Sequence, residues 1–263
     1  AAGMNFMDFI FMDGKLSIFW AVELGALATV PVIMFIFRKE RGTVTVGEPA
    51  KVEDYVPSCL LLGTVVLLIA ASFLPNRPAL TNGFICMGVF VIGILYTLIC
   101  KKSSERVKNA FKEIDFETIL LLAGLFIVIG SLTYNGIIDD ISQLLVNLGG
   151  SNLFLMYSLI VWASVLFSAF IDNIPYVATM LPVVAGIAAR MGCDARLLYF
   201  GLLVGATLGG NLTPIGASAN IAAIGILRKA GYEVKTSEFL RIGVPFTLIA
   251  VLAGYLFCWF VWA

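Results

Sequence analysis

Long apolar segments, separated by short polar stretches, run through most of this 263-residue sequence. A helix needs about 20 apolar residues to cross the roughly 30 Å hydrocarbon core of a bilayer. Five segments reach or approach that length: 16–37, 58–74, 83–100, 118–132 and 243–262. Because 60% of the residues are apolar and only 13% are charged, the chain has too little polar surface for a soluble domain. We therefore predict an all-α membrane protein that crosses the bilayer several times.

The charged residues and cysteines exclude several other classes of protein. Seventeen Lys and Arg balance 17 Asp and Glu, so no basic excess suggests nucleic acid as a partner. The five cysteines are scattered and the sequence has no histidine, so we expect neither a zinc site nor a disulfide framework. The sequence offers no nucleophile–base pair for an enzyme and no ring of like charges for a passive channel. We expect no cofactor.

The positions of lysine and arginine predict the orientation of the chain. Four, five and four of the 17 lie in the stretches 38–56, 101–117 and 228–242, and basic loops remain in the cytoplasm. All three stretches share one side only if residues 152–188 cross the membrane an even number of times. We therefore predict a multi-pass protein of the cytoplasmic (inner) membrane, with these three stretches in the cytoplasm and two crossings or a re-entrant hairpin at 152–188.

The first of two interruptions in the apolar pattern lies between the runs 153–171 and 176–188. The second run is too short to span comfortably, which favours a hairpin that dips partway into the membrane. Asp172 and Asn173 lie at its tip, and a carboxylate at membrane depth is costly and typical of a functional site. The alternative is that both residues only cap the second helix of the hairpin, with Pro175 in its first turn.

The second interruption spans residues 209–220 and separates the apolar runs 197–208 and 221–227. Gly210 and Pro214 both disfavour a continuous helix here. Unwound backbone inside a membrane is tolerated only where it is buried in protein or lines a cavity. We therefore predict one broken helix whose exposed carbonyl groups bind a cation, while the adjoining helix N-termini suit an anion. The alternative is that the small residues serve only close helix packing.

The two interruptions supply the predicted binding residues, because their side-chain and carbonyl oxygens are hard ligands for a cation. The set is Asp172, Asn173, Gly210, Asn211, Thr213, Gly216, Ser218 and Asn220. A sodium ion is expected at Asn173, Asn211 and Thr213. Glu23, the other carboxylate inside an apolar run, is a weaker candidate that can instead pair with a polar group on a neighbouring helix.

The first and last spans have similar leaders, Met7-Asp8-Phe9-Ile10 and Ser237-Glu238-Phe239-Leu240. The charge count places the two leaders on opposite sides of the membrane, as expected for repeats of inverted topology. The alternative is coincidence in apolar sequence. On the repeat interpretation, and with a start at Ala1 rather than Met, residues 1–37 are the last helix of a first repeat whose body is absent.

The two interruptions together resemble the ion-transporter superfamily, which holds citrate and divalent-anion/sodium symporters, arsenite permeases and sodium/proton antiporters. Three segments carry the resemblance: FSAFIDNIPYVATMLPVV (167–184), GATLGGNLTPIGASANIAAIGIL (205–227) and IDFETILLLAGLFIVIGSL (114–132). The resemblance implies the second half of an inverted-repeat, elevator-type carrier, expected to form a homodimer. Such a half has about six transmembrane helices plus a re-entrant hairpin and one broken helix.

The resemblance also divides the chain by role. Residues 38–134 would be scaffold helices, residues 135–227 the hairpin and broken helix that hold the transport site, and residues 228–263 an amphipathic linker and final span. We expect cation-coupled (Na⁺ or H⁺) transport of a small inorganic or organic anion. The alternatives are Na⁺/H⁺ antiport through Asp172 and arsenite permeation, for which the scattered cysteines offer no thiolate cluster. The expected partners are the transported ion, membrane lipid and the absent first repeat.

Overall fold

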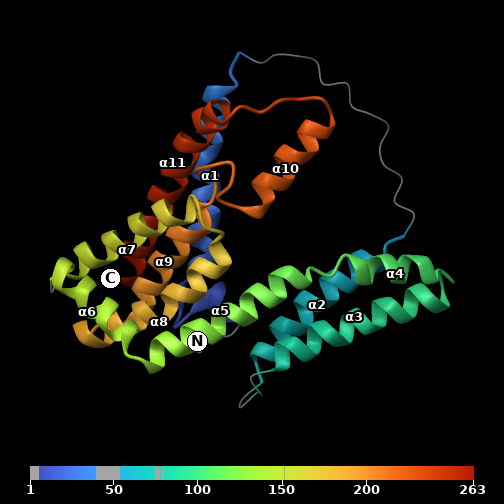
Figure 1. Ribbon diagram of the computed structural model, residues 1–263, viewed down its shortest axis with the longest axis horizontal. Helices are drawn as coiled ribbons and strands as arrows, with labels where there is room; N and C mark the ends of the chain where they lie inside the picture. The colour runs from blue at the N-terminus through green and yellow to red at the C-terminus, as the bar shows by residue number, and fades with distance from the viewer. Residues whose placement is uncertain (1–5, 40–53, 75–77, 79, 151) are drawn as a thin grey trace. The chain divides into compact units, whose positions relative to one another are not determined.

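The computed structural model describes residues 6–39, 54–74, 78, 80–150 and 152–263, and it is built almost entirely of helices (Figure 1). The chain divides into two compact units, one made chiefly of residues 9–39 and 120–263 and the other chiefly of residues 54–119. We describe each unit by itself. The boundary between the units falls inside one helix, α5 (Phe116–Tyr134).

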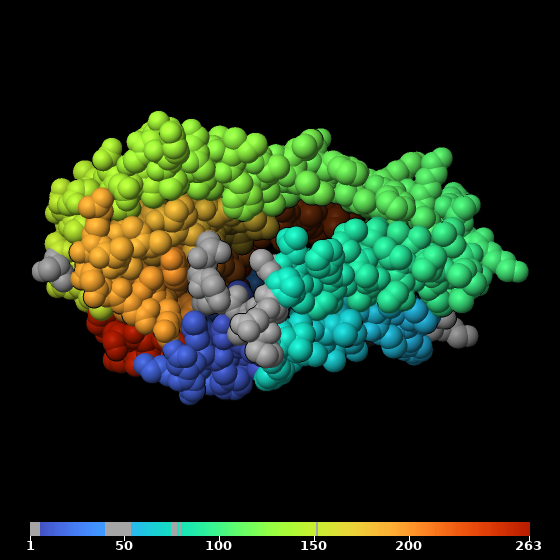
Figure 2. All heavy atoms as spheres, turned by 90° about the horizontal axis from the view of Figure 1, so that it is seen from below, coloured from blue at the N-terminus to red at the C-terminus, as the bar shows by residue number. Residues whose placement is uncertain are grey.

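The smaller unit contains α2 (Val56–Ser72), α3 (Thr81–Ile99) and α4 (Ser104–Lys112). Helices α2 and α3 pack side by side, as the space-filling view in Figure 2 also shows. The short helix α4 contacts α3 through the rings of Phe90 and Phe111, whose centroids lie 6.0 Å apart. This unit therefore consists of two apolar helices and one polar helix packed against the second of them.

The larger unit begins with a small antiparallel hairpin, β1 (Phe11–Met12) and β2 (Lys15–Leu16), which follows the 3-10 turn Met7–Phe9. Its helices are α1 (Ile18–Ile36), the distal part of α5, α6 (Ile137–Gly149), α7 (Leu153–Ser168), α8 (Asn173–Met191), α9 (Ala195–Gly209), α10 (Ser218–Lys229) and α11 (Thr236–Trp262). Helix α9 packs against α7, α8 and α11, and α1 packs against α11. The core of this unit therefore centres on α9.

Glycines on α9 allow α7 to approach it closely. A Cβ atom on Gly201 would lie 2.7 Å from the Tyr157 ring, and one on Gly209 would lie 2.7 Å from the Cα atom of Val165. Gly205, one turn from each, faces Val161 in the same way. Hydrophobic burial does not drive helices together inside a membrane. Small residues at this four-residue spacing allow the close van der Waals packing that does.

Aromatic residues pack between α7 and α11 and connect the two helices. The rings of Tyr157 and Tyr255 stack with centroids 5.0 Å apart, and the Tyr157 hydroxyl donates a 2.8 Å hydrogen bond to the Tyr255 carbonyl. Tyr157 is fully buried, and its hydroxyl has a partner, as a buried polar group requires. Helices α7, α9 and α11 thus form one rigid cluster.

The structure confirms the all-α membrane fold. Helices α1, α2, α3, α5 and α11 occupy the five predicted apolar segments. Among the described residues, five helical segments are long and apolar enough to cross a membrane: Ile18–Ile36, Thr81–Ile99, Ser104–Tyr134, Asn173–Met191 and Thr236–Trp262. Most of the predicted cytoplasmic stretch 38–56 lies outside the described residues.

Two details differ from the sequence-based expectation. Helix α8 has 19 residues rather than 13, because Asn173 and Pro175 form its first turn and the helix continues to Met191. Its length alone therefore no longer favours a half-depth hairpin, which stays a prediction. The two similar leaders also differ in structure, because Met7–Phe9 is a 3-10 turn whereas residues 237–240 belong to the first turns of α11.

We predict that Gly205→Ala lowers the stability of the larger unit. The new methyl group would lie 2.7 Å from the Ser164 Cβ atom, and overpacking of this kind costs about 1–3 kcal/mol. Gly225→Ala is the matched control, because a Cβ atom at that helical position meets nothing within 4 Å. Thermal unfolding in detergent should show a lower midpoint for the first variant only, and equal midpoints would contradict the packing argument.

Candidate functional site

The first predicted interruption forms a short connection between α7 and α8. Helix α7 ends at Ser168 and α8 begins at Asn173, so residues 169–172 make the tip. Asp172 is the N-cap of α8, and its Oδ1 atom accepts a 3.2 Å hydrogen bond from the backbone N–H of Ile174. Pro175 falls in the first turn, where its missing N–H costs nothing. Asp172 therefore caps α8, and the first turn of the helix accommodates Pro175.

The second predicted interruption is also present. Helix α9 ends at Gly209 and α10 begins at Ser218, which leaves residues 210–217 as an unwound break. The Asn220 side-chain amide reaches back from α10 and donates to the carbonyl oxygens of Gly210 and Thr213, both at 3.0 Å. One side chain thus satisfies two carbonyls that the break removes from helical bonding.

The tip and the break touch each other. The Thr213 hydroxyl donates to the Ala169 carbonyl, and the Ser218 hydroxyl donates a 2.6 Å hydrogen bond to Oδ2 of Asp172. A Cβ atom on Gly216 would lie 2.8 Å from the Ala169 carbonyl oxygen, so only glycine allows this approach. We call residues 168–173 and 210–218 together the crossing.

Six of the eight predicted binding residues take part in the contacts within the break or between it and the tip: Asp172, Gly210, Thr213, Gly216, Ser218 and Asn220. Asn173 instead lines a cavity of about 290 Å³ between α8 and α9, together with Thr207. Asn211 lines a different cavity of about 440 Å³. The structure therefore does not bring Asn173, Asn211 and Thr213, the three candidate sodium ligands, into one cavity.

Glu23 lies away from these contacts. Its side chain is exposed on α1, and it forms no hydrogen bond or ion pair with the other described residues. Neither of its two predicted roles, as a ligand or as the partner of a neighbouring helix, is visible in the described part of the chain.

The cavity beside Asn211 reveals a carboxylate that sequence reasoning missed as a site residue. Glu238, in the first turn of α11, lines this cavity together with Asn211 and Asn220. The cavity lies between α10 and α11, which Figure 1 shows connected by a long loop. In the sequence, Glu238 belongs to the leader Ser237-Glu238-Phe239-Leu240, which indicated only a repeat. Its closeness to the break could not be read from the sequence, because it depends on how α10 folds back.

The electrostatics of the crossing follow from its helix ends. Helices α8 and α10 both begin there, and a helix N-terminus carries roughly half a positive charge. Asp172 caps α8 and also accepts from Ser218, the first residue of α10. Helix α10 itself begins without a side-chain cap. One carboxylate thus lies at two helix N-termini, one of which has backbone N–H groups still available to an anion.

The oxygen atoms of the crossing suit a small hard cation. The tip and the break bring these oxygens together in two groups of hydrogen bonds, one that links the Ser218 hydroxyl to the Asp172 carboxylate and one that involves the carbonyls of Ala169, Gly210 and Thr213. Carboxylate, hydroxyl and carbonyl oxygens are the ligands that hard cations prefer. The crossing therefore combines groups for a cation with a helix end for an anion.

Comparison with known proteins gives a consistent result over most of the chain. Residues 1–205 match the family described as citrate transporter (CitMHS). The chain is 32% identical to the 46 kDa membrane protein of Mycobacterium leprae over 98% of its own length and 60% of that protein. It is 28% identical to an uncharacterized transporter of Synechocystis, covering 98% of the chain and 61% of that protein.

A match over a shorter part of the chain is the human P protein, at 33% identity over 74% of the chain and 24% of that protein. The chain thus spans about 60% of the length of the first curated relatives that it matches.

We predict that Thr213→Val loosens the crossing. Valine keeps the shape of threonine but leaves the Ala169 carbonyl without its hydroxyl donor, and an unsatisfied buried acceptor costs about 1–3 kcal/mol. Thr133→Val on α5 is the control, because Thr133 is exposed and its hydroxyl bonds only within its own helix, to Ile129. Hydrogen exchange at residues 210–218 should rise in the first variant alone; equal exchange in both would refute this role for Thr213.

Proposed function

The chain belongs to the citrate transporter family, and we propose that it takes part in cation-coupled secondary active transport of a small anion. The observation that carries the proposal is the position of Asp172 at the adjoining N-termini of α8 and α10. This arrangement would provide a cation site next to an anion site. Citrate, after which the family is described, is one candidate for the anion.

Coupling follows from the charge on Asp172. An anion that approaches the free N–H groups of α10 meets the Asp172 carboxylate, whose Oδ2 atom accepts a hydrogen bond from Ser218 at the start of that helix. Two negative charges at this separation repel each other, and more strongly at the low effective dielectric of a membrane protein than in water. A sodium ion on Asp172, or a proton, removes the repulsion, so the cation and the anion favour each other's binding.

The contacts of the crossing also support an elevator-type movement. Hydrogen bonds from Thr213 and Ser218 join the break to the tip, and Ser168 donates a 2.6 Å bond from α7 to the Ala206 carbonyl of α9. Because the tip and the break are bonded to each other, they would travel together with their cargo as one body. In a complete carrier, α2 and α3 would then belong to the scaffold against which they move.

We predict that Asp172→Asn abolishes coupling and leaves the fold intact. Asparagine still caps the helix through its Oδ1 atom, and its amide group can donate to the Ser218 hydroxyl instead of accepting from it, but it carries no charge to attract a cation. In proteoliposomes of the full-length protein, anion uptake driven by a Na⁺ or pH gradient should fall to the level seen without a gradient. The stimulation of anion binding by the cation, expected at about 5- to 150-fold, should disappear.

Asp194→Asn is the matched control for this variant. Asp194 caps α9 as Asp172 caps α8, with a 2.9 Å bond from the N–H of the residue two positions on. It is not part of the crossing, so gradient-driven uptake should survive its substitution. Unchanged coupling in the Asp172 variant would remove that carboxylate from the mechanism.

The same experiment distinguishes the two alternatives. Gradient-driven exchange of Na⁺ for H⁺ that needs no anion would identify antiport through Asp172 instead of symport. Uptake of arsenite in preference to carboxylate anions would identify a permease.

A further inference from the structure

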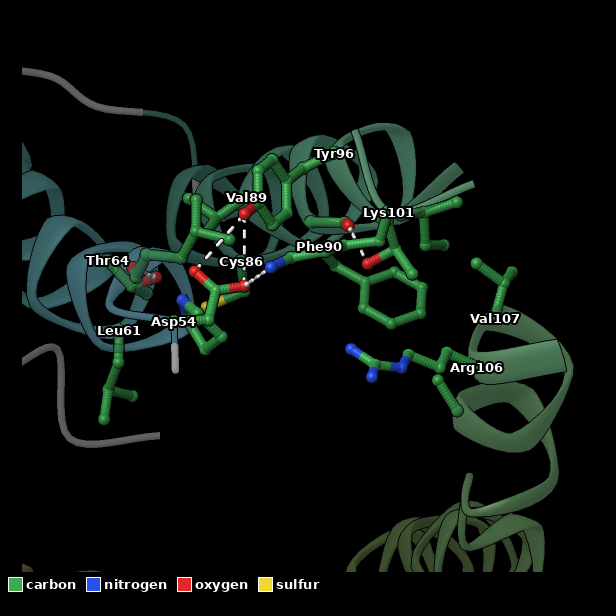
Figure 3. A pocket seen from close by; sticks show the side chains of 16 residues that line it. Asp54, Leu61, Thr64, Cys86, Val89, Phe90, Tyr96, Lys101, Arg106 and Val107 are labelled. Atoms are coloured by element: carbon green, nitrogen blue, oxygen red, sulfur yellow. Dashed lines mark hydrogen bonds and ion pairs between the residues drawn. The ribbon is translucent and has the colours of Figure 1, made fainter. Parts of the chain in front are cut away.

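A separate cavity lies in the smaller unit, between α2, α3 and α4. Its volume is about 540 Å³, and Figure 3 shows the side chains that line it. The lining is apolar along the two long helices and polar at one end, where Asp54, Tyr96, Lys101 and Arg106 gather. Apolar lining residues such as Leu61, which is 69% exposed, are not covered by the other described residues of this unit.

A fixed network organises the polar end. The Asp54 carboxylate accepts a 3.0 Å hydrogen bond from the backbone N–H of Val56. It also accepts a 3.1 Å bond from the Tyr96 hydroxyl and pairs with the Lys101 ammonium at 3.0 Å (Figure 3). Two hydrogen bonds lower the pKa of the Asp54 carboxyl from its ordinary value. The bond from the Val56 N–H has the larger effect, and the bond from the Lys101 ammonium has the next largest. The charges of Asp54 and Lys101 therefore compensate each other and keep Lys101 at the edge of the cavity.

Arg106 supplies a positive charge that this network does not compensate. Figure 3 shows its guanidinium reaching from α4 into the cavity, with no bond to the other residues drawn. Its side chain forms no ion pair with any described residue. A guanidinium presents parallel N–H groups that match a phosphate in a bidentate way.

The length of the cavity matches the hydrocarbon thickness of one membrane leaflet. It reaches along α3 from Tyr96 at the polar end to Cys86, and ten residues of helix rise about 15 Å. That length is half of the roughly 30 Å hydrocarbon core. The polar end adjoins the start of α2 and the end of α3, which the lysine and arginine count places on the cytoplasmic side.

We propose that this cavity binds an anionic phospholipid, with its phosphate at Arg106 and Lys101 and one acyl chain lying along α2 and α3. Charge complementarity selects the headgroup, because the lining has one uncompensated cation and the cytoplasmic leaflet is rich in anionic lipids. The exposed leucine, valine and phenylalanine side chains select an acyl chain rather than a soluble anion. This site is independent of the crossing and of the function proposed for it.

Native mass spectrometry of the full chain, released from nanodiscs that contain phosphatidylglycerol and phosphatidylcholine, tests the proposal. The protein should retain phosphatidylglycerol in preference to phosphatidylcholine. Arg106→Gln should weaken that retention by about fivefold, the factor expected for one basic residue at a membrane surface. Lys112→Gln, which removes the same charge from the same helix but outside the cavity, should leave retention unchanged.

Two further arms separate the headgroup from the chain. Cys86→Phe fills the apolar end of the cavity and should weaken retention of long-chain but not short-chain phosphatidylglycerol. An excess of inorganic phosphate should fail to displace the long-chain lipid. Equal retention by the Arg106 and Lys112 variants, no preference for phosphatidylglycerol, or displacement by free phosphate would each overturn the proposal. Arg106 and Lys112 are both exposed, so neither substitution disturbs the core.

Discussion

The hydrogen bonds between the tip and the break are the interactions on which the larger unit depends. Two stretches of non-helical backbone lie within apolar sequence, and lipid offers their N–H and C=O groups no partners. Side chains supply part of what is needed, because the Thr213 hydroxyl donates to the Ala169 carbonyl and the Asn220 amide donates to the carbonyls of Gly210 and Thr213. The Ser218 hydroxyl adds a second bond between the two stretches, to the Asp172 carboxylate. Gly216 permits the approach, since any side chain there would collide with carbonyl oxygens. The same contacts that satisfy the backbone therefore also assemble the oxygen-rich site.

Sequence reasoning reached the parts of this arrangement that local chemistry determines. The apolar segments predicted the helices, and Gly209, Gly210 and Pro214 predicted the break, because composition and backbone restriction act locally. The length of α8 was underestimated, because only the apolar run 176–188 was counted, whereas the helix begins at Asn173 and continues to Met191. The separation of Asn173 from Asn211 into different cavities could not be predicted, since it depends on Asn220 folding α10 back against the break. The position of Glu238 in the same cavity as Asn211 was missed for the same reason.

Two aspartates in this protein show how one residue type serves two purposes. Asp54 and Asp172 each accept the backbone N–H two positions on. Asp54 then pairs with Lys101, a permanent cation, whereas the second partner of Asp172 is the neutral hydroxyl of Ser218. A carboxylate next to a lysine has its charge compensated and serves structure. A carboxylate next to a hydroxyl has no side-chain cation beside it, which leaves it suited to an ion that arrives and departs.

The glycines that face α7 continue along α9 to the point where that helix ends. The α9 backbone lies directly against the backbone or a ring of α7 at Gly201, Gly205 and Gly209. The break begins at the next residue, Gly210. The carbonyl oxygens of the break are thus anchored to a part of the molecule with almost no room to shift. In the transport site proposed above, oxygen atoms held so firmly would adjust little to ions of different radius, and the flexibility of a site is one of the factors by which it distinguishes cations. Discrimination between sodium and larger alkali ions would then originate in helix packing several residues away from the ligands themselves.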